Sequence, residues 1–245
     1  MQNYLIYISY NGKNYAGYQL QKNANTVGAE IKKALLSLFG EISELHGCSR
    51  TDSGVHAKEF AVSFKAEKQM PENTVVKALN AKLPSDISVS RCEYVPDSFH
   101  ARYSVKKKEY RYVIYTGKTR EPFLSDFSYS VGRNLDIEKM NRAAGFLVGK
   151  HDFTAFKAVG GKTEDCVRTI FSAGFEENGN VTVFSIVGDG FLYKMVRLIV
   201  GTLIDVSDGK IKAEDIPEIL KEKKQTPGFA APPQGLFLYR VYYED

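Results

Sequence analysis

Residues 4–12 read YLIYISYNG, a run of aromatic and β-branched residues that ends in the turn pair Asn-Gly. Such a run predicts a β-strand followed by a tight turn. Residues 110–117 read YRYVIYTG and repeat the same pattern. Apolar residues at helical spacing follow both runs, from Val27 to Leu38 and from Ile137 to Leu147. The order of elements therefore begins twice, which predicts two related halves.

Each half is expected to contain several short strands and helices. The first half reads β-α-β-α-β, with strands near residues 60–64 and 87–95 and a helix after Pro71. The elements expected in the second half are a hairpin over residues 170–187, an apolar helix over 191–206 and a final strand over 236–243. The alternation of strands and helices predicts an α/β protein rather than an all-helical or all-β one.

The expected fold class is α/β of the α+β type, with halves at residues 1–104 and 105–245. We expect ferredoxin-like or RRM-like halves that share a mixed, mainly antiparallel sheet with helices on one face. A cleft between the two halves is part of this expectation.

The composition is typical of a soluble globular protein. Of its 245 residues, 43% are hydrophobic and 25% are charged. No run of about 18 apolar residues is present, so we expect no membrane span. The first residues lead directly into a strand and lack the pattern of a signal peptide. Three widely spaced cysteines suit a reducing compartment, so a cytoplasmic location is expected.

The positive charge is concentrated in one segment, residues 101–120. The net charge of the chain is +4, whereas this segment alone carries +6 and the remainder −2. The segment holds one acid, Glu109, and seven bases: Arg102, Lys106, Lys107, Lys108, Arg111, Lys118 and Arg120. Four tyrosines lie among them. Cations bind phosphates and aromatic rings stack on unpaired bases, which favours RNA; a solvated edge strand protected by lysines is the alternative.

Two nucleotide-binding patterns in the chain are incomplete. Residues 161–163 read GKT, but Phe156 replaces the leading glycine of a phosphate loop. Residues 188–190 read GDG, but Tyr193 stands where a dinucleotide fingerprint needs glycine. The cysteines and the four histidines lack the spacing of metal ligands. We therefore expect neither a nucleotide cofactor nor a metal.

Residues 50–57 read RTDSGVHA and remain as a candidate for catalytic chemistry. Asp-Ser-Gly is good turn chemistry, because Asp bonds its own backbone and Gly takes a positive φ. The same residues place the Asp52 carboxylate on a tight loop near Arg50, whose charge favours an ionised nucleophile or general base. The residues alone leave both interpretations open. His56 is typical of a loop histidine that bonds its neighbours.

Residues 47–57, GCSRTDSGVHA, resemble the active-site loop of the tRNA pseudouridine synthase A (TruA) family. Further stretches resemble other signatures of that family: FHARYS at 99–104 followed by YRY at 110–112, FLYKMVRLIVG at 191–201 and APPQGL at 231–236. The resemblance covers essentially the whole chain in the right order. Departures from the family pattern are Cys48, Ser49, Tyr18 in place of a tryptophan and Gly28 in place of a larger polar residue.

The resemblance implies a cofactor-free isomerase that converts uridine to pseudouridine in the anticodon stem-loop of tRNA. It assigns the nucleophile to Asp52, and Arg50 and Arg197 would keep this carboxylate ionised. Tyr110 would stack on the target base. The alternatives are a surface arginine on a polar helix stripe for Arg197 and a packing aromatic in a strand for Tyr110.

The resemblance also implies tRNA as partner and a homodimer. Residues expected to contact the RNA backbone are Arg102, Lys106, Lys107, Lys108 and Arg111. The alternative function is a non-catalytic RNA-binding protein of related architecture. An acid that faces phosphates weakens RNA binding, so the Asp52 carboxylate argues against that alternative. A phosphate-loop kinase is disfavoured by Phe156.

Overall fold

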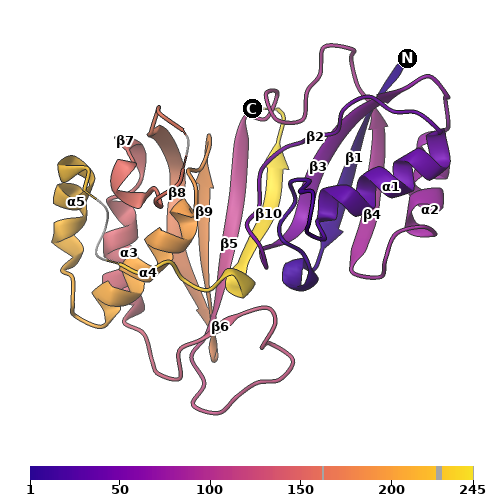
Figure 1. Ribbon diagram of the computed structural model, residues 1–245. Helices are drawn as coiled ribbons and strands as arrows, with labels where there is room; N and C mark the ends of the chain where they lie inside the picture. Colours follow the sequence, from indigo (N-terminus) through magenta and orange to yellow (C-terminus); the bar gives the residue numbers. More distant parts are fainter. Residues whose placement is uncertain (162, 225–227, 245) are drawn as a thin grey trace. The chain divides into compact units, whose positions relative to one another are not determined.

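The computed structural model describes residues 1–161, 163–224 and 228–244 (Figure 1). Lys162, the middle residue of the GKT run, lies outside the described residues. The chain forms two compact units. The first unit comprises Met1–Lys106 together with the C-terminal segment from Phe237, and the second unit comprises Lys107–Leu236.

The first unit contains the predicted β-α-β-α-β order and two further strands. Its elements are β1 (Gln2–Tyr10), α1 (Val27–Phe39), β2 (His46–Gly47), β3 (His56–Ala66), α2 (Glu72–Asn80), β4 (Ile87–Tyr94) and β10 (Leu236–Tyr242). The sheet order is β4-β1-β3-β10, and β2 pairs with β3. β10 runs parallel to β3, while the other pairs are antiparallel.

The helix α1 follows from local sequence signals. Its N-cap is Thr26, whose side chain accepts a hydrogen bond from the Ala29 amide, and it ends at Gly40 with φ +81°. The apolar stripe that includes Ile31 and Leu35 is fully buried. The helix thereby covers the face of the sheet that carries the core aromatic rings, such as Tyr4.

The segment 95–104 packs on the other face of this sheet. Phe64 stacks with Tyr4 on the face of the sheet that α1 covers. Because side chains alternate along a strand, the neighbouring Ser63 lies on the opposite face. The Ser63 hydroxyl accepts a hydrogen bond from the Ala101 amide at 3.0 Å. The Asn3 amide group donates to the carbonyl groups of Pro96 and Phe99. The segment is therefore fixed to the sheet at several points.

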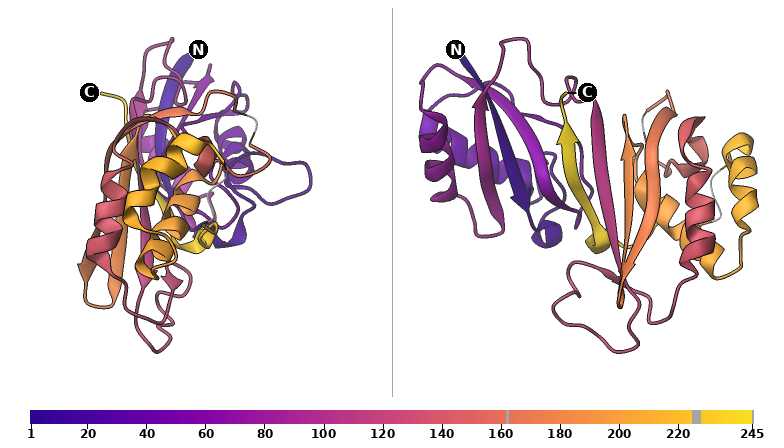
Figure 2. Two further views of the ribbon diagram at one scale, coloured as in Figure 1. Left: turned by 90° about the vertical axis from the view of Figure 1, so that its left-hand side faces the viewer. Right: turned by 180° about the vertical axis from the view of Figure 1, so that it is seen from behind.

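The second unit contains further strands of the same 10-stranded, mainly antiparallel sheet, together with helices. Its elements are β5 (Lys107–Tyr115), β6 (Tyr129–Ser130), α3 (Ile137–Gly145), β7 (Gly149–Asp152), β8 (Val167–Asn178), β9 (Val181–Gly188), α4 (Met195–Ser207) and α5 (Ile216–Glu222). The order is β5-β9-β8-β7, and β6 pairs in parallel with β5. Tyr112, Phe184 and Phe175 pair across three strands and share one buried face. Helices α3 and α4 lie on that side (Figure 2).

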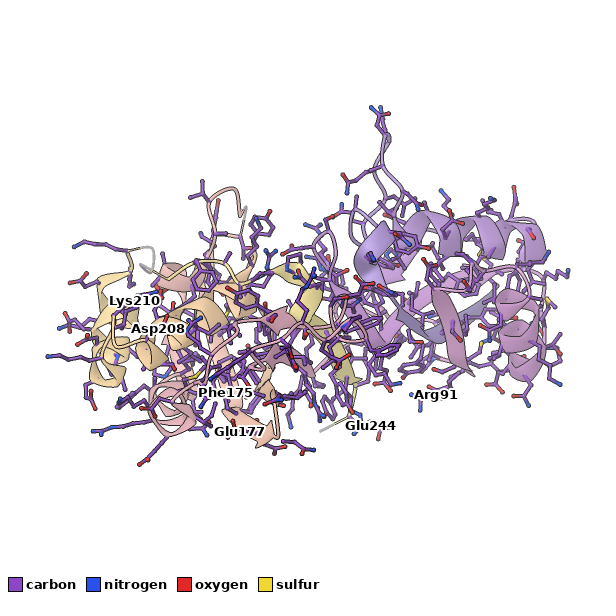
Figure 3. All side chains as sticks on the ribbon, turned by 90° about the horizontal axis from the view of Figure 1, so that it is seen from below. Arg91, Phe175, Glu177, Asp208, Lys210 and Glu244 are labelled. Atoms are coloured by element: carbon purple, nitrogen blue, oxygen red, sulfur yellow. The ribbon has the colours of Figure 1, made fainter. Side chains whose placement is uncertain are left out.

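The end of α4 is fastened by charged side chains. Arg133 makes a two-pronged hydrogen bond to the Asp208 carboxylate. Lys210 lies 2.7 Å from Asp205 and 3.2 Å from Asp208, and Figure 3 labels Asp208 and Lys210 at this end of the helix. Because the body of α4 is almost entirely buried, these ion pairs hold in place a helix that is already packed.

Two details differ from the sequence-based expectation. The final strand was expected in the second half, at residues 105–245, but Phe237 and Leu238 of β10 pair with His56 and Ala57 in the first unit. Helix α4 begins at Met195 instead of residue 191, because Lys194 adopts a left-handed backbone conformation with φ +56°.

Candidate functional site

Asp52 lies on the loop between β2 and β3, residues 48–55, which we call the Asp52 loop. Gly54 has φ +77°, a conformation that glycine adopts freely, and the Val55 amide donates to the Asp52 carbonyl at 3.2 Å. The turn expected from Asp-Ser-Gly is therefore confirmed. The Asp52 side chain is half-buried, and Arg50 lies exposed two residues earlier on the same loop.

A second loop, residues 11–18, holds the Asp52 loop; we call it the supporting loop. The carbonyl group of Tyr15 accepts hydrogen bonds from the Gly54 amide at 3.2 Å and from the Ser53 hydroxyl at 3.3 Å. The amide of Tyr18 donates to the Thr51 carbonyl at 3.4 Å. Hydrogen bonds thus fix the backbone on both sides of Asp52.

Glycines allow the two loops to approach this closely. Gly17 has φ +88°, and a Cβ atom at this residue would overlap the Thr51 carbonyl oxygen. A Cβ atom at Gly12 would overlap the Val55 carbonyl oxygen in the same way. Backbone of this kind leaves no room for a side chain, so both positions require glycine.

Buried side chains also stabilise the Asp52 loop and the supporting loop. The hydroxyl groups of Tyr10 and Thr51 share a buried hydrogen bond of 2.8 Å. His56 is buried, its Nδ1 accepts a hydrogen bond from the Gly12 amide at 3.0 Å, and its ring stacks on Phe237. The histidine therefore bonds its neighbours as expected, but it is the first residue of β3 and not a loop residue.

The supporting loop is itself anchored to Asp86, which sequence reasoning did not identify. The Tyr15 hydroxyl donates to the Asp86 carboxylate at 2.6 Å, and the Asn11 amide donates to the Asp86 carbonyl at 2.9 Å. Burial and the bond to this carboxylate raise the pKa of the Tyr15 phenol, which therefore stays a donor. No sequence motif connects Asp86 to either loop, because the chain brings them together only when it folds.

Three departures from the family pattern, Tyr18, Gly28 and Cys48, pack closely against their neighbours. The Tyr18 ring packs on Phe60 with centroids 4.3 Å apart, and a Cβ atom at Gly28 would lie 2.6 Å from the Tyr18 carbonyl oxygen. The Cys48 sulfur is buried and accepts a hydrogen bond from the Ala61 amide. Among the described residues, the buried Tyr18 hydroxyl has no hydrogen-bond partner.

Tyr110 lies in the second unit, on β5. Its side chain is only 6% exposed, and its ring meets Phe191 edge-on with centroids 5.0 Å apart. Phe191 belongs to the segment just before α4, and sequence reasoning did not assign it a role. The signal that could have identified Phe191 is that it is an aromatic residue in a run that resembles a family signature, residues 191–201. The contact leaves both packing and stacking on a base open for Tyr110.

Arg197 projects from α4 and is half-buried. Its Nε donates to the Ala231 carbonyl at 2.6 Å, and the Ala231 amide donates to the Arg197 carbonyl at 3.0 Å. The Tyr112 hydroxyl donates to the neighbouring Pro232 carbonyl. Burial raises the pKa of Tyr112, and the Arg197 charge acts in the opposite direction. Arg197 thus joins α4 to the APPQGL segment and is not a solvated arginine of a polar stripe.

The predicted RNA-binding residues have different surroundings. Arg102 and Lys106 are exposed residues of the first unit. In the second unit, the Lys107 ammonium lies 5.3 Å from the centre of the Phe171 ring, and Arg111 pairs with Glu109 at 2.7 Å. Lys108, also on β5, is half-buried. The exposed pair is therefore best placed to meet phosphates.

The structure thus groups the predicted residues by unit. Asp52 and Arg50 share one loop of the first unit, whereas Tyr110 and Arg197 belong to the second. Within residues 1–161, 163–224 and 228–244, His, Cys, Asp and Glu side chains form no group of three that could hold a metal ion. In the same ranges, every helix is too short or too polar to cross a bilayer.

Comparison with known proteins gives a consistent result. The family described as tRNA pseudouridine synthase matches residues 6–104 and 143–244. A protein of Thermoanaerobacter sp. (strain X514), described as tRNA pseudouridine synthase A, is 44% identical over 99% of this chain and 100% of its own. A protein of Bacillus licheniformis with the same description is 44% identical over 97% of this chain and 98% of its own.

A solved structure is also similar to this chain. It is described as the crystal structure of a Cbf5-Nop10-Gar1 complex and aligns with 82% of this chain and 44% of its own. The TM-score is 0.38 at 12% sequence identity, a level at which the likeness carries no argument.

Proposed function

Because this chain belongs to the tRNA pseudouridine synthase A (TruA) family, we propose that it isomerises uridine in the anticodon stem-loop of tRNA with Asp52 as its nucleophile. The family supports the reaction. The observation that supports Asp52 is the carboxylate on a loop whose backbone is held on both sides by the supporting loop. A reactive group fixed in advance loses little freedom when the substrate binds.

The reaction needs a nucleophile or base and no external reagent. The bond between ribose C1′ and uracil N1 breaks, the base turns, and C5 joins C1′ while N1 gains a proton and C5 loses one. Every atom except the exchangeable protons is conserved, so neither a redox partner nor a group donor is needed. Attack of Asp52 on C1′, attack on uracil C6 and abstraction of a ribose proton all satisfy this balance.

In this proposal, positive and aromatic groups assist the carboxylate. Arg50 and Arg197 supply positive charge that stabilises the ionised Asp52. Tyr110 stacks on the target base, and its phenol can act as a proton donor or acceptor. The target base must leave its stack to react, which costs a few kcal/mol. Contacts of Arg102, Lys106, Lys107, Lys108 and Arg111 with the RNA backbone would offset part of that cost.

We further propose that the protein acts on tRNA as a homodimer in the cytoplasm, without a cofactor. The homodimer and the cofactor-free reaction come with the family resemblance, and the three widely spaced cysteines support the cytoplasmic location. The alternative is a non-catalytic RNA-binding protein of the same architecture. The Asp52 loop disfavours it, because a half-buried carboxylate beside bound phosphates lowers affinity unless it takes part in a reaction.

The test is Asp52→Asn, with tritium release from C5-labelled uridine in tRNA as the readout. The amide keeps the shape of the side chain and its turn, but it is a far weaker nucleophile. We expect tRNA binding and the circular dichroism spectrum to be unchanged. The rate should fall by at least about a thousandfold, on the order of 4 kcal/mol.

Asp97→Asn is the matched control, because Asp97 is a largely exposed aspartate of the same unit that pairs with Lys65. It should retain the wild-type rate. If Asp52→Asn also retains a rate within about tenfold of wild type, the carboxylate is a turn residue and not the nucleophile.

A further inference from the structure

Three aromatic rings form a stack on the first unit, apart from the residues assigned above. The His46 and His100 rings lie 4.0 Å apart with planes 27° from parallel. The Tyr103 ring lies 4.4 Å from His100 at 38°. Tyr103 is 78% exposed, so it contributes little to the core. Most of the Tyr103 ring is therefore accessible at the end of this series of rings.

The backbone of this stack is fixed before any ligand arrives. The amides of Tyr103 and Ser104 both donate to the His100 carbonyl, and the His100 amide donates to the Ser104 hydroxyl. Ala101, which lies between His100 and Tyr103 in the sequence, is buried, and its carbonyl accepts a hydrogen bond from the Tyr243 hydroxyl at 2.9 Å. A preformed platform binds with a smaller loss of conformational entropy than a mobile one.

The rings of the stack suit a neutral π partner. The Arg102 amide donates to Nδ1 of His100, which requires an unprotonated nitrogen. Burial and the adjacent His46 lower the pKa of His100, so this ring is uncharged at neutral pH. Arg102 and Lys106 are exposed beside it, and the Arg102 guanidinium lies 6.0 Å from the centre of the Tyr103 ring. Glu44 is the acid whose charge reaches His100.

We propose that the stack of His46, His100 and Tyr103 is a binding platform for an unpaired RNA base, with Arg102 placed for the adjoining phosphate. A largely exposed ring that is held against a second ring is a surface on which a base can stack, and base–aromatic stacking is worth about 1–3 kcal/mol. The proposal rests on RNA being the substrate. It assigns the platform to a nucleotide other than the uridine that reacts, because Tyr110 is proposed for that base.

The test compares Tyr103→Leu with Tyr103→Phe in the full chain. Binding of a single-stranded RNA oligonucleotide and of unmodified tRNA is measured by fluorescence anisotropy, and KM and kcat by tritium release. We expect Leu to raise Kd and KM by about 5- to 150-fold, the equivalent of stacking one base. Phe should stay within about twofold of wild type, and kcat and the melting temperature should be unchanged for both.

Two further variants separate stacking from charge and from general hydrophobicity. Arg102→Gln should flatten the dependence of log Kd on log salt by about one unit, whereas Tyr103→Leu should leave that slope unchanged. Phe123→Leu removes another exposed ring, 89% exposed and in the second unit, and should not change Kd.

Wild-type Kd values for Tyr103→Leu would overturn the platform, whether or not the protein is active. A fall in kcat at constant KM would also overturn it, since Tyr103 would then act on the reacting base. Failure of the proposed function looks different, because wild type and all variants would then release no tritium while the binding measurement still reports on the stack.

Discussion

At the scale of single residues, Tyr110 has two possible roles that mutation can separate. If the ring stacks on the target uracil, Tyr110→Leu should lower kcat/KM by a factor that corresponds to about 1–3 kcal/mol of transition-state stabilisation. Tyr110→Phe should then keep most of the activity. If the phenol transfers a proton, Tyr110→Phe should already be inactive. The measurement is tritium release at limiting and saturating tRNA.

The edge-on contact with Phe191 supplies the control for Tyr110. Phe191→Leu disturbs the same packing without removing the phenol. Wild-type kinetics in both Tyr110 variants, together with a lower melting temperature in all three, would make Tyr110 a packing residue of β5 and contradict the assigned role.

The sequence predicted the residues of the Asp52 turn, because turn chemistry is local. Asp52 and Gly54 lie within three residues, and their types alone indicate the turn that the structure contains. Asp86 could not be predicted in this way. Its hydrogen bond to Tyr15 is made only when distant parts of the chain meet, and an aspartate before a strand carries no signal of that partner.

At the scale of elements, the close approach of the supporting loop to the Asp52 loop predicts the effect of Gly17→Ala. The added Cβ atom meets the Thr51 carbonyl oxygen, and the φ of +88° is strained for alanine. We expect a loss of stability of about 1–3 kcal/mol and a fall in kcat of at least about tenfold, because the carboxylate moves with its loop. Urea unfolding and tritium release measure the two effects.

Gly40→Ala is the control for backbone strain. Gly40 has φ +81° in the same unit, but a Cβ atom there meets nothing within 4 Å. It should lose a similar amount of stability and keep its kcat. Equal activity of the two variants would mean that the position of the Asp52 loop does not depend on Gly17.

Existence of the strands was predictable, but some of their pairings were not. Runs of aromatic and β-branched residues predicted β1 and β5, and the structure buries nearly all of β1 on both of its faces. The parallel pairing of β10 with β3 joins residues far apart in the chain, and periodicity carries no information about partners. The start of α4 was also missed, because a left-handed Lys194 is not a local preference of lysine.

At the scale of the whole molecule, the uneven charge distribution predicts strongly salt-dependent tRNA binding. Exchange of Lys106, Lys107 and Lys108 for Gln should lower affinity for all tRNAs and flatten the log–log salt slope by roughly one to two units. Exposed Lys106 should contribute most, because Lys107 and Lys108 are half-buried. The single-turnover rate at saturating tRNA should remain nearly unchanged.

The control for the lysine exchange is a second triple variant at the exposed residues Lys77, Lys82 and Lys221. This variant removes the same charge outside the basic segment, residues 101–120, and should change the slope of log Kd against log salt less. If both triple variants give the same slope, binding responds to net charge alone. The basic segment is then a solvated surface of the protein.

The β10 strand has a consequence for how the protein is made. The second unit interrupts the first in the chain, so the ribosome synthesises residues 107–236 before the strand that pairs beside His56 and Ala57 emerges. The nascent first unit therefore waits, with an incomplete sheet next to the Asp52 loop, until translation has passed Leu236. Every product of premature termination within the second unit carries the Asp52 loop without its neighbouring strand.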